Sequence, residues 1–232
     1  MKLELRPGSE RGRMQLDWLD TRYTFSFGEY FDPEHMGFRA LRVINEDRVA
    51  PGTGFGRHPH QDMEILTYVL SGAVRHEDSA GGAGIVRAGE LQRMTAGTGI
   101  THSEQNASAD EELHLLQIWV LPEREGLAPG YEQREVPTAR EGELVLLASR
   151  TGGGDALRIH QDAQVFLGIA AAANPVRFTP RVERHYWVQV TRGSVLIDGR
   201  GLEAGDGASI SAAVELTFES ADRGEFLLFD LA

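Results

Sequence analysis

The sequence predicts an all-β protein with two barrel-like halves, and three observations support this fold class. Short runs of β-branched and aromatic residues alternate with turns, and 27 of the 232 residues are glycine. Segments of a dozen or more residues show no apolar period of 3.6, so helices should be few and short. A strand–turn–strand pattern in the first half recurs in the second, which is typical of a duplicated barrel.

Predicted strands follow one another along the whole chain. In the first half they are expected at the alternating or apolar runs 38–44, 64–70 and 113–120. In the second half they are expected at 144–148, 164–167, 185–190, 215–218 and 226–229. The stretch between the halves is rich in Pro, Gly and Glu, which indicates a connection between domains. We therefore expect an N-terminal domain at 1–122, a linker at 123–143 and a C-terminal domain at 144–232.

The internal repeat is centred on two glycines. Residues 67–74 align with residues 187–195 when Gly72 and Gly193 are superposed. A second pair of matching turns, each Ala-Gly-acid, is found at 88–90 and 204–206. The same scaffold is therefore expected in both halves.

Composition narrows the class of partner. The formal net charge is -12, which argues against direct contact with nucleic acid or with an anionic membrane surface. Cysteine is absent, so any metal must be held by His, Asp or Glu. The first residues, MKLELRPGSERGRMQLDW, include no apolar run of the kind found in secretory signals, and a cytoplasmic location is the expectation.

Two short histidine motifs point to a metal site in the first half. His58 and His60 flank a proline, and His102 is followed two residues later by Glu104. On a β-strand the i, i+2 spacing places both side chains on one face, so two neighbouring strands could bring all four groups together. Imidazole binds Fe, Zn, Cu and Ni well, and a carboxylate adds an anionic oxygen. Glu64 is a competing carboxylate, with the same strand parity as His58 and His60.

These motifs resemble those of the cupin superfamily. The first cupin motif, G-x5-H-x-H-x3/4-E, is matched by Gly52, His58, His60 and Glu64. The second begins at Gly89 and is matched farther on by Gly99, His102 and Asn106. It departs from the general form, because Thr95 stands where proline is usual and the segment 94–99 carries two extra residues.

That departure is similar to the pirin family, including its bacterial quercetinase-like members. The pirin-like segments are TFSFG at 24–28, HPH at 58–60, HEDS at 76–79 and MTAGTGITHSE at 94–104. The resemblance is strong over residues 20–122 and looser in the second half. It implies a bicupin, with two jelly-roll β-barrel domains, of which only the N-terminal one binds metal.

The resemblance also implies a cofactor and an activity. One divalent transition metal ion would be held by His58, His60, His102 and Glu104, with iron expected first and Ni, Co, Mn, Cu or Zn left open. The implied reaction is quercetin 2,3-dioxygenase activity, the cleavage of a planar flavonol by O2 with release of carbon monoxide. Glu104 has two roles open to it, as a lasting metal ligand or as the general base that accepts the substrate hydroxyl proton.

Two other functions compete with the dioxygenase. One is a non-enzymatic regulatory protein that responds to metal or redox state and binds a protein partner. The other is an isomerase or hydrolase that uses the metal only as a Lewis acid.

Several residues have a structural interpretation instead of a functional one. We assign Glu64 a supporting role, expect His76 to bond local backbone, and expect His114 to face outward or to be hydrogen-bonded. His160 and His185 belong to the half without ligands. Five aromatic residues suit either the walls of a flat pocket or the barrel core: Phe25, Phe27, Phe31, Phe55 and Tyr68.

Overall fold

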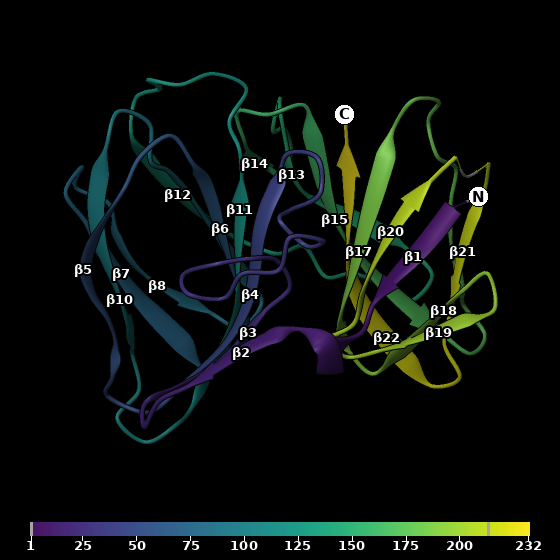
Figure 1. The fold of residues 1–232 in the computed structure, drawn as a ribbon, viewed down its shortest axis with the longest axis horizontal. Helices are drawn as coiled ribbons and strands as arrows, with labels where there is room; N and C mark the ends of the chain where they lie inside the picture. The colour runs from purple at the N-terminus through teal and green to yellow at the C-terminus, as the bar shows by residue number, and fades with distance from the viewer. Residues whose placement is uncertain (1, 213) are drawn as a thin grey trace. The chain divides into compact units, whose positions relative to one another are not determined.

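The computed structural model describes residues 2–212 and 214–232, and nearly all of its regular structure is β-strand (Figure 1). Within these residues there is no α-helix, and one 3-10 turn, η1 (Gly8–Glu10), is the sole helical element. The described part of the chain also lacks any helix long and apolar enough to cross a membrane. The prediction of an all-β protein with few and short helices is confirmed.

The chain forms two compact units, and each is made from separate stretches of sequence. The N-terminal unit consists of residues 12–136 and 151–161. The C-terminal unit consists of residues 2–11, 137–150 and the described part of 162–232. The first strand, β1 (Lys2–Arg6), belongs to the C-terminal unit because it pairs with β20 (Gly207–Ser211) near the end of the chain.

The N-terminal unit contains a long and a short antiparallel sheet. The long sheet has the order β12-β9-β6-β11-β4-β3-β2, and the short sheet has the order β5-β10-β7-β8. The long sheet contains β2 (Gly12–Gln15), β3 (Leu19–Tyr23), β4 (Leu41–Val49), β6 (Glu64–Ser71), β9 (Glu90–Thr95), β11 (Leu113–Val120) and β12 (Gly130–Glu135). The short sheet contains β5 (Gly54–His60), β7 (Ala73–Asp78), β8 (Ala83–Arg87) and β10 (Ile100–Asn106). The two-residue strand β14 (Leu157–Arg158) also lies in this unit.

The C-terminal unit repeats this plan. Its long sheet has the order β1-β20-β17-β22-β15-β13, and its short sheet has the order β16-β21-β18-β19. The long sheet contains β1 (Lys2–Arg6), β13 (Leu144–Ser149), β15 (Ala163–Ala171), β17 (His185–Arg192), β20 (Gly207–Ser211) and β22 (Arg223–Leu231). The short sheet contains β16 (Val176–Phe178), β18 (Ser194–Ile197), β19 (Arg200–Glu203) and β21 (Leu216–Glu219).

The repeat read from the sequence corresponds to one hairpin in each unit. Strands β6 and β7 meet at Gly72, and strands β17 and β18 meet at Gly193. Both glycines have left-handed backbone, with φ of 76° and 64°, which is a conformation that residues with a Cβ rarely adopt. A Cβ would also lie 2.8 Å from the Glu112 carbonyl at Gly72 and 2.2 Å from the Arg223 carbonyl at Gly193. The turn therefore requires glycine in both halves.

Two predicted elements differ from the structure. The strand expected at 38–44 begins at Leu41 and continues to Val49, because Arg39 has a φ of 56° in a turn that precedes it. The stretch predicted as a linker contains β12, whose backbone pairs with β9 from Gly130 to Glu135. Without β12 the strand β9 would be an unpaired sheet edge, and pairing with residues 130–135 covers that edge.

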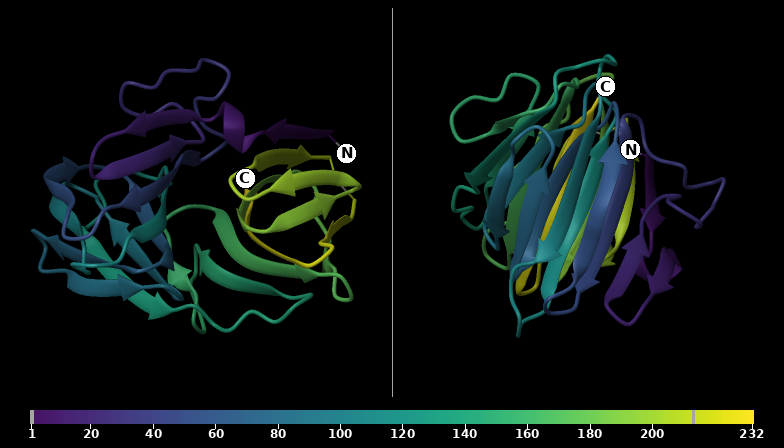
Figure 2. Two further views of the ribbon diagram at one scale, coloured as in Figure 1. Left: turned by 90° about the horizontal axis from the view of Figure 1, so that it is seen from below. Right: turned by 90° about the vertical axis from the view of Figure 1, so that its left-hand side faces the viewer.

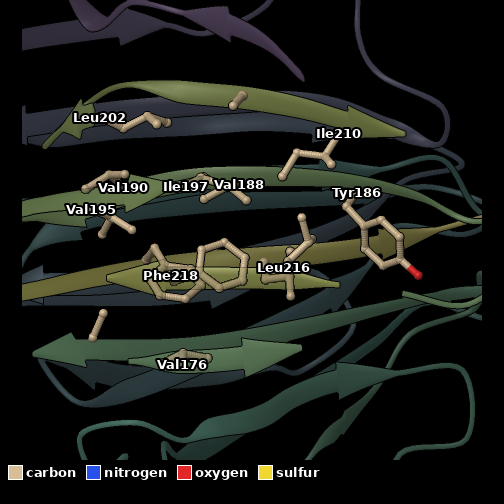
Figure 3. Close-up of a cluster of buried hydrophobic side chains, with 14 residues drawn as sticks. Val176, Tyr186, Val188, Val190, Val195, Ile197, Leu202, Ile210, Leu216 and Phe218 are labelled. Carbon is tan, nitrogen blue, oxygen red and sulfur yellow. The ribbon is translucent and has the colours of Figure 1, made fainter. Parts of the chain in front are cut away.

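The interiors of the two units differ in polarity. The strands of the C-terminal unit curve around a common interior (Figure 2, left, green and yellow), which is filled by a cluster of fourteen buried apolar residues. Figure 3 shows Val176, Leu216 and Phe218 in this cluster, on strands of the short sheet. In the N-terminal unit, smaller apolar clusters lie beside buried polar side chains, which line much of the short sheet.

Candidate metal centre

Three histidines converge on the short sheet of the N-terminal unit. His58 and His60 lie on β5, and His102 lies on β10 directly opposite His58 in the antiparallel register. The ring centroids are 4.4 Å apart for His58 and His102, and 4.8 Å apart for each of the other two pairs. One ring nitrogen from each residue lies within 4.8 Å of the others, so one ion could contact all three.

The hydrogen bonds and protonation of these rings suit a metal. The Nδ1–H of His58 donates to the Gly56 carbonyl at 2.7 Å, which leaves Nε2 as the coordinating atom. Burial, together with the charge of the neighbouring imidazoles, lowers the pKa of His60 to about 4 and that of His102 to about 2. Both rings are therefore neutral at neutral pH, the form that binds a metal. The buried Nε2 of His102 finds no hydrogen-bond partner among the described residues.

Glu104 lies beside the histidines and is held by two polar side chains. Its carboxylate accepts a hydrogen bond of 2.6 Å from Gln117 and one of 3.3 Å from Thr67. Burial raises the pKa of this carboxyl, partly offset by His76 and by the hydrogen bond from Gln117. Its nearest ligand-type neighbours are His76 and His102, with which it forms a second group of possible ligand atoms within 4.8 Å.

The prediction made for His76 from the sequence was wrong. The expectation was a bond to local backbone in a turn, but His76 lies on β7, opposite Glu104, and is fully buried. Its Nε2–H donates to Asp78 at 3.0 Å, and its Nδ1 lies 3.4 Å from Nδ1 of His102. The missed signal was the alternation of Val74, His76 and Asp78, which places all three on one face of a strand.

Glu64 takes no part in this cluster. Its carboxylate is fully buried and accepts the backbone N–H of His160 at 3.2 Å. The parity it shares with His58 and His60 is lost at Asp62, where a φ of 46° interrupts the extended chain between β5 and β6. Glu64 therefore makes a structural hydrogen bond within the N-terminal unit, to which His160 also belongs.

A cavity of about 210 Å³ lies against the histidines. Its other walls are largely apolar and aromatic: Leu19, Tyr23, Phe27, Phe55, Ile65 and Trp119. The indole of Trp119 meets the His60 ring edge-on, with centroids 4.8 Å apart. Of the five aromatic residues considered from the sequence, Phe27 and Phe55 line this cavity, whereas Phe25 and Tyr68 are buried elsewhere and Phe31 is 71% exposed.

Comparison with known families identifies the chain. A family profile described as Pirin matches residues 5–120, and one described as Quercetinase C-terminal cupin domain matches residues 146–231. The chain belongs to the pirin family. Its fold is the two-domain cupin fold of pirins, so the bicupin implied by the motifs is confirmed.

Individual relatives agree with this assignment. A quercetin 2,3-dioxygenase of Escherichia coli K12 is 46% identical over 227 residues, 98% of this chain and 97% of that protein. The crystal structure of YhhW from Escherichia coli has a TM-score of 0.95 and 44% identity, and the match covers 100% of this chain and 98% of that one. A structure of the bacterial pirin YhhW in complex with nickel(II) has a TM-score of 0.94 at 44% identity, with 99% of each chain covered.

Three further polar residues of this pirin line the cavity and were missed by sequence reasoning: Thr21, Asn45 and Asp47. The strand predicted at 38–44 ends before Asn45 and Asp47. The signal was the continued alternation along β4, which places Asn45 and Asp47 on the same inward face as Val43.

Proposed function

We propose that this pirin is a metal-dependent dioxygenase that cleaves flavonols such as quercetin with O2. Its metal is one divalent transition ion, with iron expected first and nickel supported by the nickel(II) complex of the Escherichia coli pirin. His58, His60 and His102 hold the ion, and Glu104 is the fourth ligand or the general base. The observation that carries the proposal is that three neutral imidazoles converge on one wall of an apolar cavity.

The residues present fit such an ion. The unpartnered Nε2 of His102 is a buried acceptor whose desolvation a metal would offset, and imidazoles with one carboxylate are a donor set for Fe, Ni or Zn. A bound ion would supply Lewis acidity and, if redox-active, a route for electrons. The rest of the chemistry belongs to the chain's own residues.

The side chains around the cavity bind the substrate and handle its proton. Phe27, Phe55 and Trp119 provide apolar surface for flat aromatic rings and exclude water from them. Where Glu104 acts as the general base and not as a ligand, its carboxylate accepts the proton of the acidic substrate hydroxyl. Gln117 and Thr67 hold that carboxylate in place through their hydrogen bonds, so its position is fixed before substrate enters.

Oxygen uptake tests the proposal. Protein loaded separately with Fe(II), Ni(II), Co(II) and Mn(II) is mixed with quercetin, and His102→Ala is compared with His114→Ala. His114 is a matched control because its Nε2 bonds Glu46 at 2.8 Å on another part of the unit, as its sequence position led us to expect. We expect metal-dependent uptake that disappears only in His102→Ala. Metal-bound protein that consumes no oxygen with quercetin would contradict the proposal.

Two finer predictions belong with this function. A cytoplasmic location is expected, and cell fractionation tests it. A protein partner of the regulatory kind would be captured in a metal-dependent manner that flavonols do not affect. The net charge of -12 favours a small molecule or a protein over nucleic acid or an anionic membrane surface.

A further inference from the structure

The cavity has a second polar region that the metal centre does not use. Thr21 on β3, with Asn45 and Asp47 on β4, are 2%, 5% and 3% exposed, and all three line the cavity. The two groups of possible metal ligands consist of other residues. These side chains are therefore buried polar groups in a mainly apolar cavity, for which the proposed reaction gives no role.

Strand register places this region on the side of the cavity toward β3. Thr21 is directly opposite Asp47, and Asn45 is directly opposite Gln117 on β11. Gln117 in turn donates to Glu104. Neighbouring strands lie about 4.8 Å apart, so a row of polar side chains extends about 10 Å across the sheet, from the strand that holds Glu104 in place to β3.

The hydrogen-bonding capacity of this region is unfilled. Oγ1 of Thr21 and Oδ1 of Asn45 are fully buried, and within residues 2–212 and 214–232 neither has a partner at hydrogen-bonding distance and angle. The Thr21 hydroxyl lies near enough to the Asp47 carboxyl to lower its pKa, so the two side chains form one polar group. Buried polar atoms of this kind are rare in folded proteins, because each lost hydrogen bond to water is costly. The unfilled atoms are oxygens that accept hydrogen bonds, and Asp47 adds a carboxyl beside them. The chemistry that satisfies such a cluster is a hydroxyl group of a ligand.

We propose that Thr21, Asn45 and Asp47 form a subsite that binds a hydroxyl group on the part of the substrate remote from the metal. This inference rests on the proposed function and defines its substrate class more narrowly. The ligand is a planar polyphenol of two or three rings, with one oxygen group at the metal centre and a second hydroxyl at the three polar side chains that line the same cavity.

Two isosteric variants test the subsite. Thr21→Val and Asn45→Leu each remove an unfilled oxygen and keep the side-chain volume similar. Binding is measured without oxygen on metal-loaded protein, with quercetin and with the flavonol that lacks hydroxyl groups on its pendant ring. Wild-type protein should prefer quercetin, and each variant should reduce the ratio of the two affinities about tenfold, which corresponds to about 1.4 kcal/mol.

The melting temperature of the ligand-free variants gives a second readout. Replacing an unpartnered buried oxygen by a methyl group should raise the melting temperature, whereas loss of a structural hydrogen bond would lower it. Thr191→Val is the matched control, because the Thr191 hydroxyl is buried in the C-terminal unit and donates to Glu225 at 2.8 Å. It should lower the melting temperature and leave the affinity ratio unchanged.

The outcomes distinguish failure of the subsite proposal from failure of the proposed reaction. An unchanged affinity ratio, or equal loss of both flavonols, would overturn the subsite. Selective binding that the variants weaken, without oxygen uptake in air, would keep the subsite and overturn the dioxygenase. Wild-type protein that binds neither flavonol would overturn both.

Discussion

At the scale of single residues, the metal centre depends on which nitrogen of His102 carries its proton. Asp78 accepts from Nε2–H of His76, which leaves the His76 Nδ1 as an acceptor facing Nδ1 of His102. The Gln92 amide is a second donor at 3.4 Å from this acceptor. With the proton of His102 on Nδ1, where it faces His76, the Nε2 lone pair of His102 is available to an ion. A chain of carboxylate and imidazole of this kind fixes the tautomer and orientation of a metal ligand.

Removing His76 should therefore weaken metal binding without removing a ligand. We expect His76→Ala to lower the affinity for Ni(II) or Fe(II) about 10- to 100-fold, because His102 loses the acceptor that orients it. Competition with a chelator of known affinity measures this. His114→Ala, which removes a hydrogen-bonded histidine outside the centre, should bind metal as the wild type does. Equal affinities in all three proteins would show that His76 does not position His102.

Asp47 should make the stability of the metal-free protein depend on pH. Burial raises the pKa of Asp47 to about 7, with the Thr21 hydroxyl opposing the rise and the charge of Glu104 adding to it. Because the unfolded carboxyl titrates near its ordinary value of about 3.9, the folded state holds this proton more tightly. The contribution is favourable at low pH and is lost as pH rises through about 7.

Asp47→Asn removes the pH-dependent contribution of this carboxyl. The free energy of unfolding of the variant, relative to that of the wild type, should therefore increase between about pH 4 and about pH 8. The limiting change is about 4 kcal/mol in the free energy of unfolding, from about three pKa units. Urea unfolding of both chelator-treated proteins at several pH values measures it. A constant difference between the two proteins across this range would mean that the Asp47 carboxyl titrates normally in the folded state.

At the scale of elements, local periodicity predicted most of what the structure contains. The i, i+2 spacing of His58 and His60 requires only an extended strand, and the structure has one. The hairpin at Gly72 can be predicted from the sequence because its turn needs left-handed backbone, which favours glycine. Predictions from periodicity were wrong where a strand began or ended at another residue, or where a turn changed the face to which the following side chains point. Asp62 interrupts the extended chain before Glu64, and the turn at Arg39 shifts β4 towards Asn45 and Asp47.

The remaining features could not be predicted because they depend on which strands, far apart in the sequence, pair or face one another. Residues 130–135 are rich in polar residues and resemble a linker by composition, yet they form β12 because β9 needs a backbone partner. Glu104 is another case. Its motif identifies it as a ligand candidate, but only the fold shows that Gln117 and Thr67 hold its carboxylate and that His76 lies beside it. A sequence states neither the partner strand nor the residues facing across an interior.

At the scale of the whole molecule, one scaffold serves two purposes. The short sheet of the C-terminal unit presents Val176, Leu216 and Phe218 to an apolar core (Figure 3). The matching sheet of the N-terminal unit presents histidines and Glu104. Burial of apolar surface stabilises the first, whereas buried polar groups without full hydrogen bonding destabilise the second. The N-terminal unit therefore gains most from a bound ion.

Removal of the metal should loosen one short sheet and leave its counterpart unchanged. An ion present at about 100 times its Kd stabilises the folded state that binds it by about 2.7 kcal/mol, so amide exchange from that state should accelerate about 100-fold when the ion is withdrawn. Hydrogen exchange followed by mass spectrometry, before and after chelation, measures this. We expect faster exchange in β5, β7 and β10, while β16, β18 and β21 serve as the internal control. Equal acceleration in both sheets would mean that the ion stabilises the chain as one cooperative unit, and no acceleration in either would place the ion outside the N-terminal unit.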